Sequence, residues 1–156
     1  MITSVLLSMC MDSTIAHEGF SNKVYKDANG YSVGYGYSLT HNPLQLTKKE
    51  LSNLKNNGIS EASARHLVTK VCVQVKDGLE AKYAWFNGLS NPRAMVLLDM
   101  GYNLGLGGLS DFNKTMGYIK LGKTTMASVE MLNSKWARQT HGRAKQLSQI
   151  MKTGEV

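Results

Sequence analysis

Two acidic residues near the start of the chain have a spacing and surroundings suited to acid–base chemistry. Glu18 directly precedes Gly19, where an apolar N-terminal segment ends, and Asp27 follows nine residues later in the turn-forming sequence Asp27-Ala28-Asn29-Gly30. A carboxyl group beside apolar residues tends to keep its proton, whereas one on a turn rich in N–H donors tends to stay ionised. Hydrolysis of a glycosidic bond uses such a pair, with one group as the acid and the other managing water.

Most of the other acidic residues have simpler structural explanations. Glu50 fits a helix cap, Glu61 fits the first turn of a helix, where negative charge is favourable, and Glu155 lies in the C-terminal tail. A structural alternative stays open for the two candidates as well. In that alternative Glu18 forms an ion pair and Asp27 only shapes its turn.

A helix and a small sheet are expected to carry the two candidates. The segment before Gly19 is predicted to be an amphipathic helix with a partly apolar face of Val5, Leu6, Met9 and Ile15. Residues 20–38 are rich in Tyr, Val, Ser and Gly and contain the turn at 27–30, which indicates short antiparallel strands. Gly34 and Gly36 are interpreted as positions where another group approaches the backbone closely.

Two helices are predicted to follow the sheet. Thr47 and Glu50 match a capping box, which opens a short helix that ends at Asn56-Asn57-Gly58. Ser60 can cap a long helix that continues to about residue 82. Its apolar stripe is formed by Leu67, Val68, Val71, Cys72, Val75 and Leu79.

The C-terminal half is predicted to form shorter helices. The first has Asn91 as its cap and Pro92 at its first position, and residues 104–109 are expected to form a flexible turn. Further helices are expected at 112–120, from Thr124 or Thr125 through Trp136, and over about 143–151. Trp85 and Trp136 are interpreted as core residues. These patterns predict an α+β fold that is mainly α, with one small antiparallel sheet near the N-terminus.

Composition restricts the class of protein. The chain has 156 residues with a 42% apolar fraction and no run of about 18 apolar residues, so one globular domain without stable membrane insertion is expected. Residues 1–11 are apolar but lack a basic region and a cleavage site, so a signal peptide is not expected. Cys10 and Cys72 are predicted to be buried thiols, with a bridge between them left open.

The net charge of +7 favours a polyanionic partner, and nucleic acid, acidic membranes and the bacterial wall all qualify. The basic residues are scattered, without a dense run or an aromatic-flanked basic motif, so charge alone does not choose among them. A nucleic-acid partner is not expected, because no motif for reading a groove or stacking on bases is present. No metal ion or cofactor is expected, since zinc spacing and a phosphate loop are both missing.

The segment HEGFSNKVYKDANGYSVGYGYSL resembles the active-site segment of the phage-type lysozymes, glycoside hydrolase family 24. The family pattern has Glu-Gly, eight residues between that Glu and an Asp or Cys, and then a Thr shortly before Gly-x-Gly. Glu18, Asp27 and the sequence Gly34-Tyr35-Gly36 match it. The segments MGYNLGLGGLSDFNKT and SKWARQTHGRAKQLSQIMKTG are also similar to the family, so the resemblance covers most of the chain in order.

The resemblance implies two lobes joined by a long helix within one domain, 1–156. The lobes would be approximately 17–60 and 83–156 plus 1–16, joined by 61–82. It also implies inverting hydrolysis of the β-1,4 bond between N-acetylmuramic acid and N-acetylglucosamine in peptidoglycan. Glu18 would be the general acid, Asp27 and Ser32 would hold the attacking water, and Arg143 would pair with the catalytic Glu.

The chain also departs from the family pattern. Ser32 stands where the family has Thr, and only four residues separate it from Asp27 where five are usual, so the hairpin should be one residue shorter. Ser38, Leu98 and Thr115 fall at positions where the family binds glycan. Asp99 occupies a position that is usually uncharged, and its role is open.

Three alternatives to the hydrolase were weighed. A lytic transglycosylase would also need the acid at Glu18 but not the water-holding pair, and a non-catalytic wall-binding protein could use the same scaffold. A basic nucleic-acid-binding module is the third.

The resemblance further implies a monomeric endolysin that causes host cell lysis. It would stay in the host cytoplasm until released to the wall through a holin pore, and a tail-associated enzyme remains open.

Overall fold

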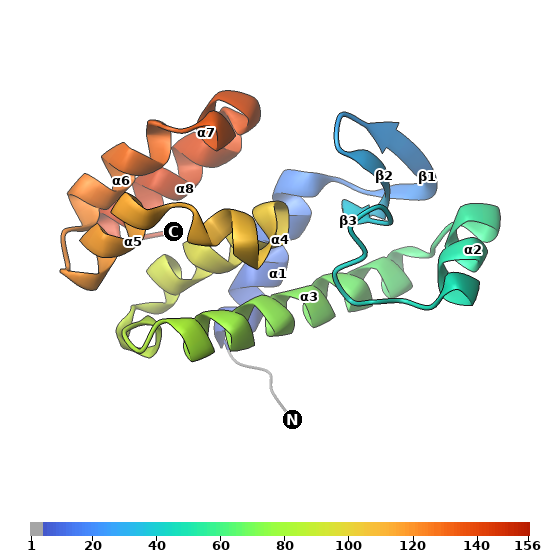
Figure 1. The fold of residues 1–156 in the computed structure, drawn as a ribbon, viewed down its shortest axis with the longest axis horizontal. Coiled ribbons are helices and arrows are strands. Elements are labelled where there is room, and N and C mark those ends of the chain that lie inside the picture. Colours follow the sequence, from blue (N-terminus) through green and yellow to red (C-terminus); the bar gives the residue numbers. More distant parts are fainter. Residues whose placement is uncertain (1–4) are drawn as a thin grey trace. The chain divides into compact units, whose positions relative to one another are not determined.

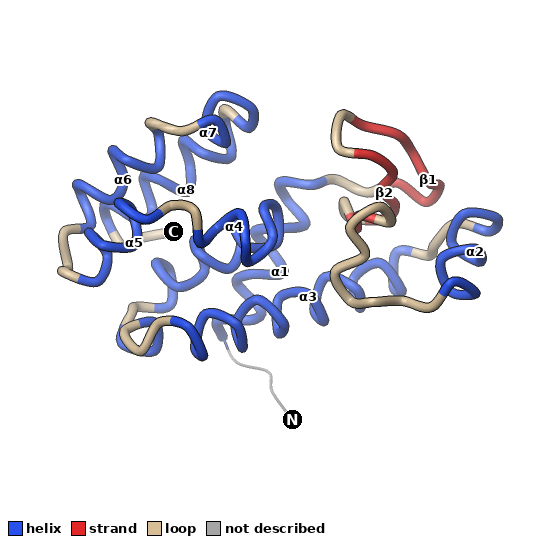
Figure 2. The backbone as a smooth tube through the Cα atoms, viewed as in Figure 1, coloured by secondary structure: helices blue, strands red, loops and turns tan. Residues whose placement is uncertain are grey.

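The computed structural model describes residues 5–156, and residues 1–4, expected to begin the first helix, lie outside the described part. Its helices are α1 (Val5–Glu18), α2 (Lys48–Asn57), α3 (Glu61–Lys82), α4 (Asn91–Ser110), α5 (Asn113–Lys120), α6 (Thr124–Leu132), α7 (Lys135–Thr140) and α8 (Gly142–Thr153), with a short 3-10 helix η1 (Phe86–Gly88). The strands are β1 (Ser21–Asp27), β2 (Gly30–Gly34) and β3 (Tyr37–Ser38). Figures 1 and 2 show helix as the dominant structure, which confirms the mainly α prediction.

The chain forms two compact units. The sheet unit comprises Met11–Gln74, and the helical unit comprises residues 5–10 together with Val75–Val156. The boundary falls within α1 and again within α3, so each of these two helices supplies residues to both units.

Helix α1 ends where the sequence predicts. Gly19 adopts a φ of 68°, and its N–H donates a hydrogen bond of 3.2 Å to the carbonyl oxygen of Ile15. A residue in this conformation stops a helix, and glycine adopts it without steric cost. The predicted apolar face is wrong at Val5, which is 66% exposed. The buried residues of α1 are Leu6, Leu7, Cys10 and Thr14. Because Thr14 is polar, a pattern of apolar residues alone does not predict the whole buried face.

The predicted hairpin is confirmed. Strands β1 and β2 are antiparallel, with Tyr25 opposite Ser32 and Asp27 opposite Gly30. Strand β3 continues the sheet on the other side of β2 and places Ser38 opposite Ser32. Ser32 therefore lies in the central strand, between residues of both neighbours.

The two helices that follow the sheet begin as predicted. The Thr47 Oγ1 accepts the Glu50 N–H at 3.1 Å, and the Glu50 Oε1 accepts the Thr47 N–H at 3.1 Å, so the capping box is complete. The hydrogen bond from the Thr47 N–H lowers the pKa of the Glu50 carboxyl group, because it favours the charged form, and the Thr47 side chain lowers it further. The Ser60 hydroxyl caps α3 by accepting the Ser63 N–H at 3.1 Å.

The structure corrects three predicted helix boundaries in the helical unit. Ser90, not Asn91, is the N-cap of α4, and Asn91 is its first residue. Residues 104–109 are not a turn, because α4 continues on both sides of a single break at Gly105, where φ is 74° and ψ is 163°. Helix α6 ends before Trp136, because Ser134 caps a separate helix α7 by accepting the Ala137 N–H at 3.1 Å.

The core of the helical unit forms where α6 packs against α5, α7 and α8, and where α4 packs against α8. Trp136 is buried there, and its indole N–H donates to the Asn103 Oδ1 at 2.8 Å. Trp85 is only half-buried, so its interpretation as a core residue is not confirmed. Cys10 and Cys72 are buried and are not joined by a disulfide, as predicted. Within residues 5–156 no helix combines the length and apolar character needed to cross a membrane.

Candidate active site

Glu18 is the last residue of α1, and its half-buried side chain lies directly against the backbone of Gly36. A Cβ atom at position 36 would come within 2.9 Å of the Glu18 Cδ and closer still to its Oε2. Gly36 also has a φ of 70°, which favours glycine. The predicted close approach is confirmed here, and the approaching group is the candidate acid.

Asp27 is the last residue of β1 and is exposed. Its Oδ1 accepts the Asn29 N–H at 2.8 Å, so the side chain shapes the hairpin loop as the structural alternative expects. A carboxylate has two oxygens and about four acceptor sites, so this bond orients the group without exhausting its capacity. The carboxylate of Asp27 can shape the turn and still bind another donor.

Ser32 is 6% exposed in the central strand and lies opposite Tyr25 of β1, so the two side chains leave the sheet on the same face. Ser38, on the other side of Ser32, is half-buried and accepts the His41 N–H at 3.0 Å through its hydroxyl. Three polar side chains therefore cross the sheet in one row.

Tyr25 connects the candidate groups of the sheet unit. It lies two residues before Asp27, so the two side chains leave β1 on the same face. Burial raises the pKa of the Tyr25 hydroxyl, the negative charges of Glu18 and Asp27 raise it further, and the hydrogen bond with Ser32 lowers it. Both carboxyl groups thus affect a hydroxyl that lies next to Ser32. Tyr25 is not among the residues predicted from the sequence, although its alternation with Asp27 in a predicted strand is a usable signal.

Arg143 lies in α8 of the helical unit, where it forms an ion pair with Asp99 of α4. The Arg143 Nε donates to the Asp99 Oδ1 at 2.7 Å, and its guanidinium also donates to the Asp99 carbonyl oxygen at 3.4 Å. Asp99 is 0% exposed and Arg143 is 8% exposed. The structure thus gives Asp99 one role that the sequence leaves open. Asp99 binds Arg143, the residue for which the family resemblance implies a supporting role.

The other two predicted glycan contacts also lie in the helical unit. Leu98 in α4 is fully buried, and Thr115 in α5 is 2% exposed. A residue contacts a ligand only through accessible atoms, so the present burial does not favour direct contact by either side chain. Their binding roles, and that of Ser38, stay predictions.

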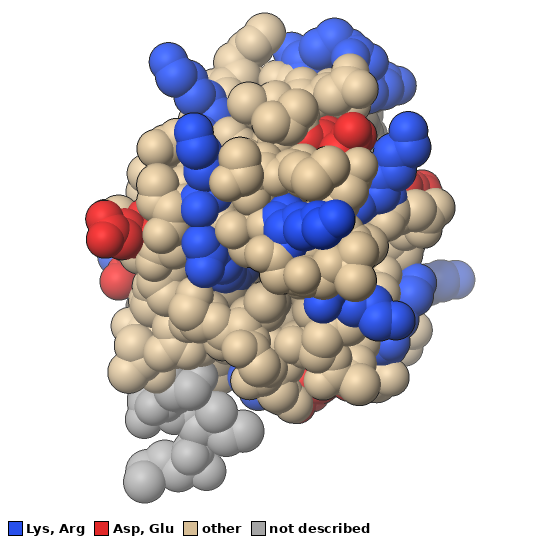
Figure 3. Space-filling model, turned by 90° about the vertical axis from the view of Figure 1, so that its left-hand side faces the viewer, with Lys and Arg blue, Asp and Glu red and all other residues tan. Residues whose placement is uncertain are grey.

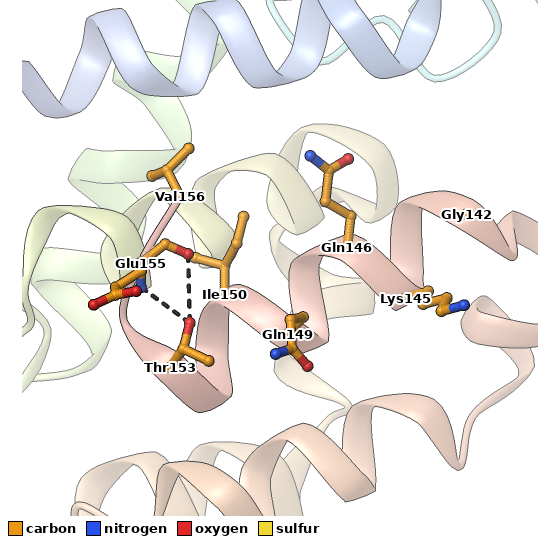
Figure 4. Close-up of a pocket in the computed structure, with 8 residues that line it drawn as sticks. All are labelled: Gly142, Lys145, Gln146, Gln149, Ile150, Thr153, Glu155 and Val156. Carbon is orange, nitrogen blue, oxygen red and sulfur yellow. Dashed lines mark hydrogen bonds between the residues drawn. The ribbon is translucent and has the colours of Figure 1, made fainter.

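A separate pocket of about 540 Å³ lies along α8 and the C-terminal tail (Figure 4). Its lining includes Lys145, Gln149 and Glu155, and the Glu155 N–H donates to the Thr153 Oγ1 at 3.1 Å. Glu155 is the one carboxylate side chain in this lining, all of which lies within the described part of the chain. A pocket with a single carboxylate lacks the pair that glycoside hydrolysis uses.

Known proteins resemble this chain over most of its length. The Phage lysozyme family model matches residues 15–152. "Probable T4-type lysozyme 2" of Dictyostelium discoideum is 26% identical, covering 97% of this chain and 98% of that protein. The "Pre-baseplate central spike protein Gp5" of Enterobacteria phage T4 is 24% identical over 89% of this chain, which corresponds to 27% of the spike protein. "Peptidoglycan hydrolase gp36" of Enterobacteria phage SP6 is 29% identical over 70% of this chain and 12% of its own length.

The family match, together with relatives named as lysozymes and as a peptidoglycan hydrolase, shows that the protein is of the glycoside hydrolase class. The match to residues 15–152 shows that the chain belongs to the phage lysozyme family. Its reaction is therefore the hydrolysis of peptidoglycan.

Proposed function

We propose that the protein is an inverting N-acetylmuramidase that cleaves the β-1,4 bond between N-acetylmuramic acid and N-acetylglucosamine. The observation that carries this proposal is the convergence of Glu18, Asp27 and Ser32 on Tyr25 in the sheet unit. An inverting glycosidase needs an acid and a second carboxylate that activates water, and a hydroxyl such as that of Ser32 can help to hold this water.

Glu18 is the proposed general acid, which protonates the leaving glycosidic oxygen. Its half-buried position at the end of α1, against the backbone of Gly36, supports this role, because the carboxyl group is held in place but stays accessible. Its contact with Gly36 limits the positions that the carboxyl group can take. Arg143 is the proposed supporting cation of the acid, and its pair with Asp99 would fix the guanidinium in place.

Asp27 and Ser32 are the proposed groups that hold the attacking water. The Asn29 N–H orients the Asp27 carboxylate, and Ser32 lies on the neighbouring strand, opposite Tyr25. Asp27 pairs with Gly30, so only Ala28 and Asn29 form the turn that joins β1 and β2. Water held on the side opposite the leaving group would invert the anomeric carbon.

The test is mass spectrometry of the products from purified peptidoglycan digested with the wild-type protein. Hydrolysis is expected to release muropeptides with reducing N-acetylmuramic acid ends. Products with 1,6-anhydro ends would instead identify a lytic transglycosylase, in which the muramic 6-hydroxyl replaces water. Binding to the wall without any released product would identify a non-catalytic wall-binding protein.

We further propose that the protein is a monomeric endolysin, which stays in the host cytoplasm until a holin pore gives it access to the wall. The family match supports the lytic role, and the similarity to the phage T4 spike protein supports a tail-associated enzyme as the second candidate. Immunogold labelling of purified phage particles separates the two. An endolysin is expected to be absent from virions, and labelling of the tail would overturn that assignment.

A further inference from the structure

Helix α6 has an apolar outer side. Met126, Val129 and Leu132 are 45%, 61% and 48% exposed on it. Residues three positions apart on a helix are neighbours, so these three side chains form one row. Of the nine large hydrophobic residues that are exposed within residues 5–156, four lie between 121 and 132, so exposed apolar surface is concentrated at this helix.

The core of the helical unit does not account for this row. The inner side of α6 carries the buried residues Ala127 and Met131, and the helix packs against α5, α7 and α8. A helix at the surface of a globular protein usually has polar residues on its outer side, because exposed apolar groups gain nothing from contact with water. The outer row is therefore available to a partner.

Exposed lysines lie at both ends of the row. Lys123 directly precedes α6, and Lys135 is the first residue of α7. Residues 113–138 contain five Lys and Arg residues and one acid, the half-buried Glu130. Figure 3 shows the side of the molecule on which α5 and α6 lie in Figure 1, and Lys and Arg cover more of it than Asp and Glu do. The surroundings of the apolar row are therefore cationic.

We propose that the outer side of α6 docks on an anionic phospholipid surface. Met126, Val129 and Leu132 enter the boundary between headgroups and acyl chains, while Lys123 and Lys135 pair with the lipid phosphates. Helices that bind at a membrane interface combine these two features, an apolar side and flanking cations. The contact is peripheral, because α6 has nine residues and its inner side stays packed in the core.

A lipid surface fits this patch better than two other partners. A soluble polyanion would pair with the lysines but would leave the apolar row in water. A second copy of the chain would cover the row, but in a symmetric dimer the same surface meets itself, so Lys123 and Lys135 of both copies would come together. Only Glu130 of each copy could offset that repulsion.

This contact goes beyond the proposed function. Helix α6 belongs to the helical unit, whereas Glu18, Asp27 and Ser32 belong to the sheet unit, so none of the proposed catalytic groups takes part. Reversible binding to a membrane concentrates the enzyme beside the wall that adjoins that membrane. Vesicle binding and product release can therefore be measured separately.

The first experiment is co-sedimentation of the full chain with vesicles of phosphatidylcholine, either alone or mixed with an equal part of phosphatidylglycerol. The wild type is expected to bind the anionic vesicles far more tightly than the neutral ones, and added salt should weaken this binding. Replacing both flanking lysines, Lys123→Gln with Lys135→Gln, should lower the affinity about 25-fold, because each lysine at an anionic surface is worth about fivefold.

The matched control for the lysines is Lys48→Gln with Lys49→Gln. These two residues are exposed on α2 of the sheet unit, and their replacement removes the same net charge from the protein. The affinity for anionic vesicles should stay close to that of the wild type, because charges away from the contact are screened.

The apolar row is tested with Val129→Asp, which is expected to abolish binding to the anionic vesicles. Val5→Asp makes the same change at an exposed valine of α1 and should bind as the wild type does. Both variants should keep the wild-type melting curve and the wild-type rate on soluble peptidoglycan fragments. A third variant, Val129→Trp, should show tryptophan emission that shifts to shorter wavelength with anionic vesicles but not with inorganic polyphosphate.

Failure of the wild type to bind anionic vesicles, or equal losses in the two lysine variants, would overturn the proposal. Unchanged vesicle binding by Val129→Asp would also overturn it, since the lysines alone would then account for the attraction. A lipid-free dimer in sedimentation velocity that Val129→Asp dissociates would assign the face to a second copy instead. Vesicle binding without hydrolysis contradicts the proposed function alone, and hydrolysis without vesicle binding contradicts the docking surface alone.

Discussion

Each unit of the protein contains a conspicuous pair of polar charged groups, and the two pairs differ in almost every physical respect. In the sheet unit, the half-buried Glu18 and the exposed Asp27 are both acidic, and both raise the pKa of the Tyr25 hydroxyl. In the helical unit, the buried Asp99 and Arg143 carry opposite charges and bond directly to each other. Breaking a buried ion pair destabilises the fold, whereas accessible acidic groups near one hydroxyl are candidates for chemistry.

The largest effect on the rate of hydrolysis is expected for a substitution of Glu18, the candidate acid. Glu18→Gln keeps the shape of the side chain but removes the acid proton, so the rate of peptidoglycan hydrolysis should fall about 100- to 10,000-fold. The midpoint of thermal unfolding should stay close to that of the wild type. Release of reducing ends and a melting curve measure the two properties.

Asp12→Asn is the matched control for Glu18, because Asp12 is an exposed acid on the same helix. It should retain full activity. Full activity in Glu18→Gln, or equal losses in both variants, would remove Glu18 from the catalytic role.

A loss of stability is expected for the buried pair of the helical unit. Asp99→Ala leaves the Arg143 guanidinium buried without its carboxylate partner, and breaking a buried ion pair in this way costs about 3–5 kcal/mol of unfolding free energy. Urea unfolding followed by circular dichroism measures the loss. Asp111→Ala, at the exposed C-cap of α4, should change the stability by no more than about 0.5 kcal/mol. A midpoint for Asp99→Ala equal to that of Asp111→Ala would show that the pair has no stabilising role.

A substitution at Gly36 tests whether catalysis depends on the position of the Glu18 carboxyl group as well as on its presence. Gly36→Ala forces the Glu18 carboxyl group to move, and a displacement of about 1 Å can cost about 100-fold in rate. Gly122→Ala is the control, since Gly122 has a similar φ of 74° but open space around its Cβ position. Similar activity in the two variants would mean that Glu18 tolerates displacement.

The smallest effect is expected at Tyr25. Tyr25→Phe removes a hydroxyl that lies next to Ser32, and the loss of one polar contact of this kind should lower the rate by about fivefold. Tyr31→Phe, on the exposed face of the same hairpin, should have no effect. A loss as large as that of Glu18→Gln would contradict a merely positioning role for Tyr25.

The raised pKa of Tyr25 also predicts a pH dependence of stability. The folded state holds the phenol proton more tightly than the unfolded chain, whose ordinary value is 10.0. The resulting contribution to stability is fully present below that value and is lost as pH rises through the raised pKa. The difference in unfolding free energy between the wild type and Tyr25→Phe should therefore be constant near neutral pH and change only in the alkaline range. A change confined to acidic pH would contradict the assignment.

Local rules predicted the elements that depend on neighbouring residues. The end of α1 at Gly19, the hairpin at 27–30 and the capping box at Thr47 each follow from backbone chemistry within a few residues, and the structure confirms them. The features that local rules did not predict depend on tertiary contacts. Packing around α4 allows Gly105 to break that helix without ending it, and burial of Thr14 places a polar residue on the inner face of α1.

The candidate site shows the same division. Spacing identified Glu18 and Asp27, but the partnership of Asp99 with Arg143 joins residues 44 positions apart and cannot be found from local patterns. Tyr25 was overlooked because a tyrosine in a strand is ordinary. Its significance depends on Ser32 across the strand and on two carboxylates that approach it from different elements.

The most direct test of the central claim is the anomeric configuration of the first product, followed by proton NMR during cleavage of a soluble peptidoglycan oligosaccharide. If Glu18 protonates the leaving oxygen while Asp27 and Ser32 deliver water from the opposite side, the newly formed reducing end appears first as the α-anomer and reaches the equilibrium mixture only later. Initial appearance of the β-anomer would contradict direct attack by water held at Asp27 and Ser32.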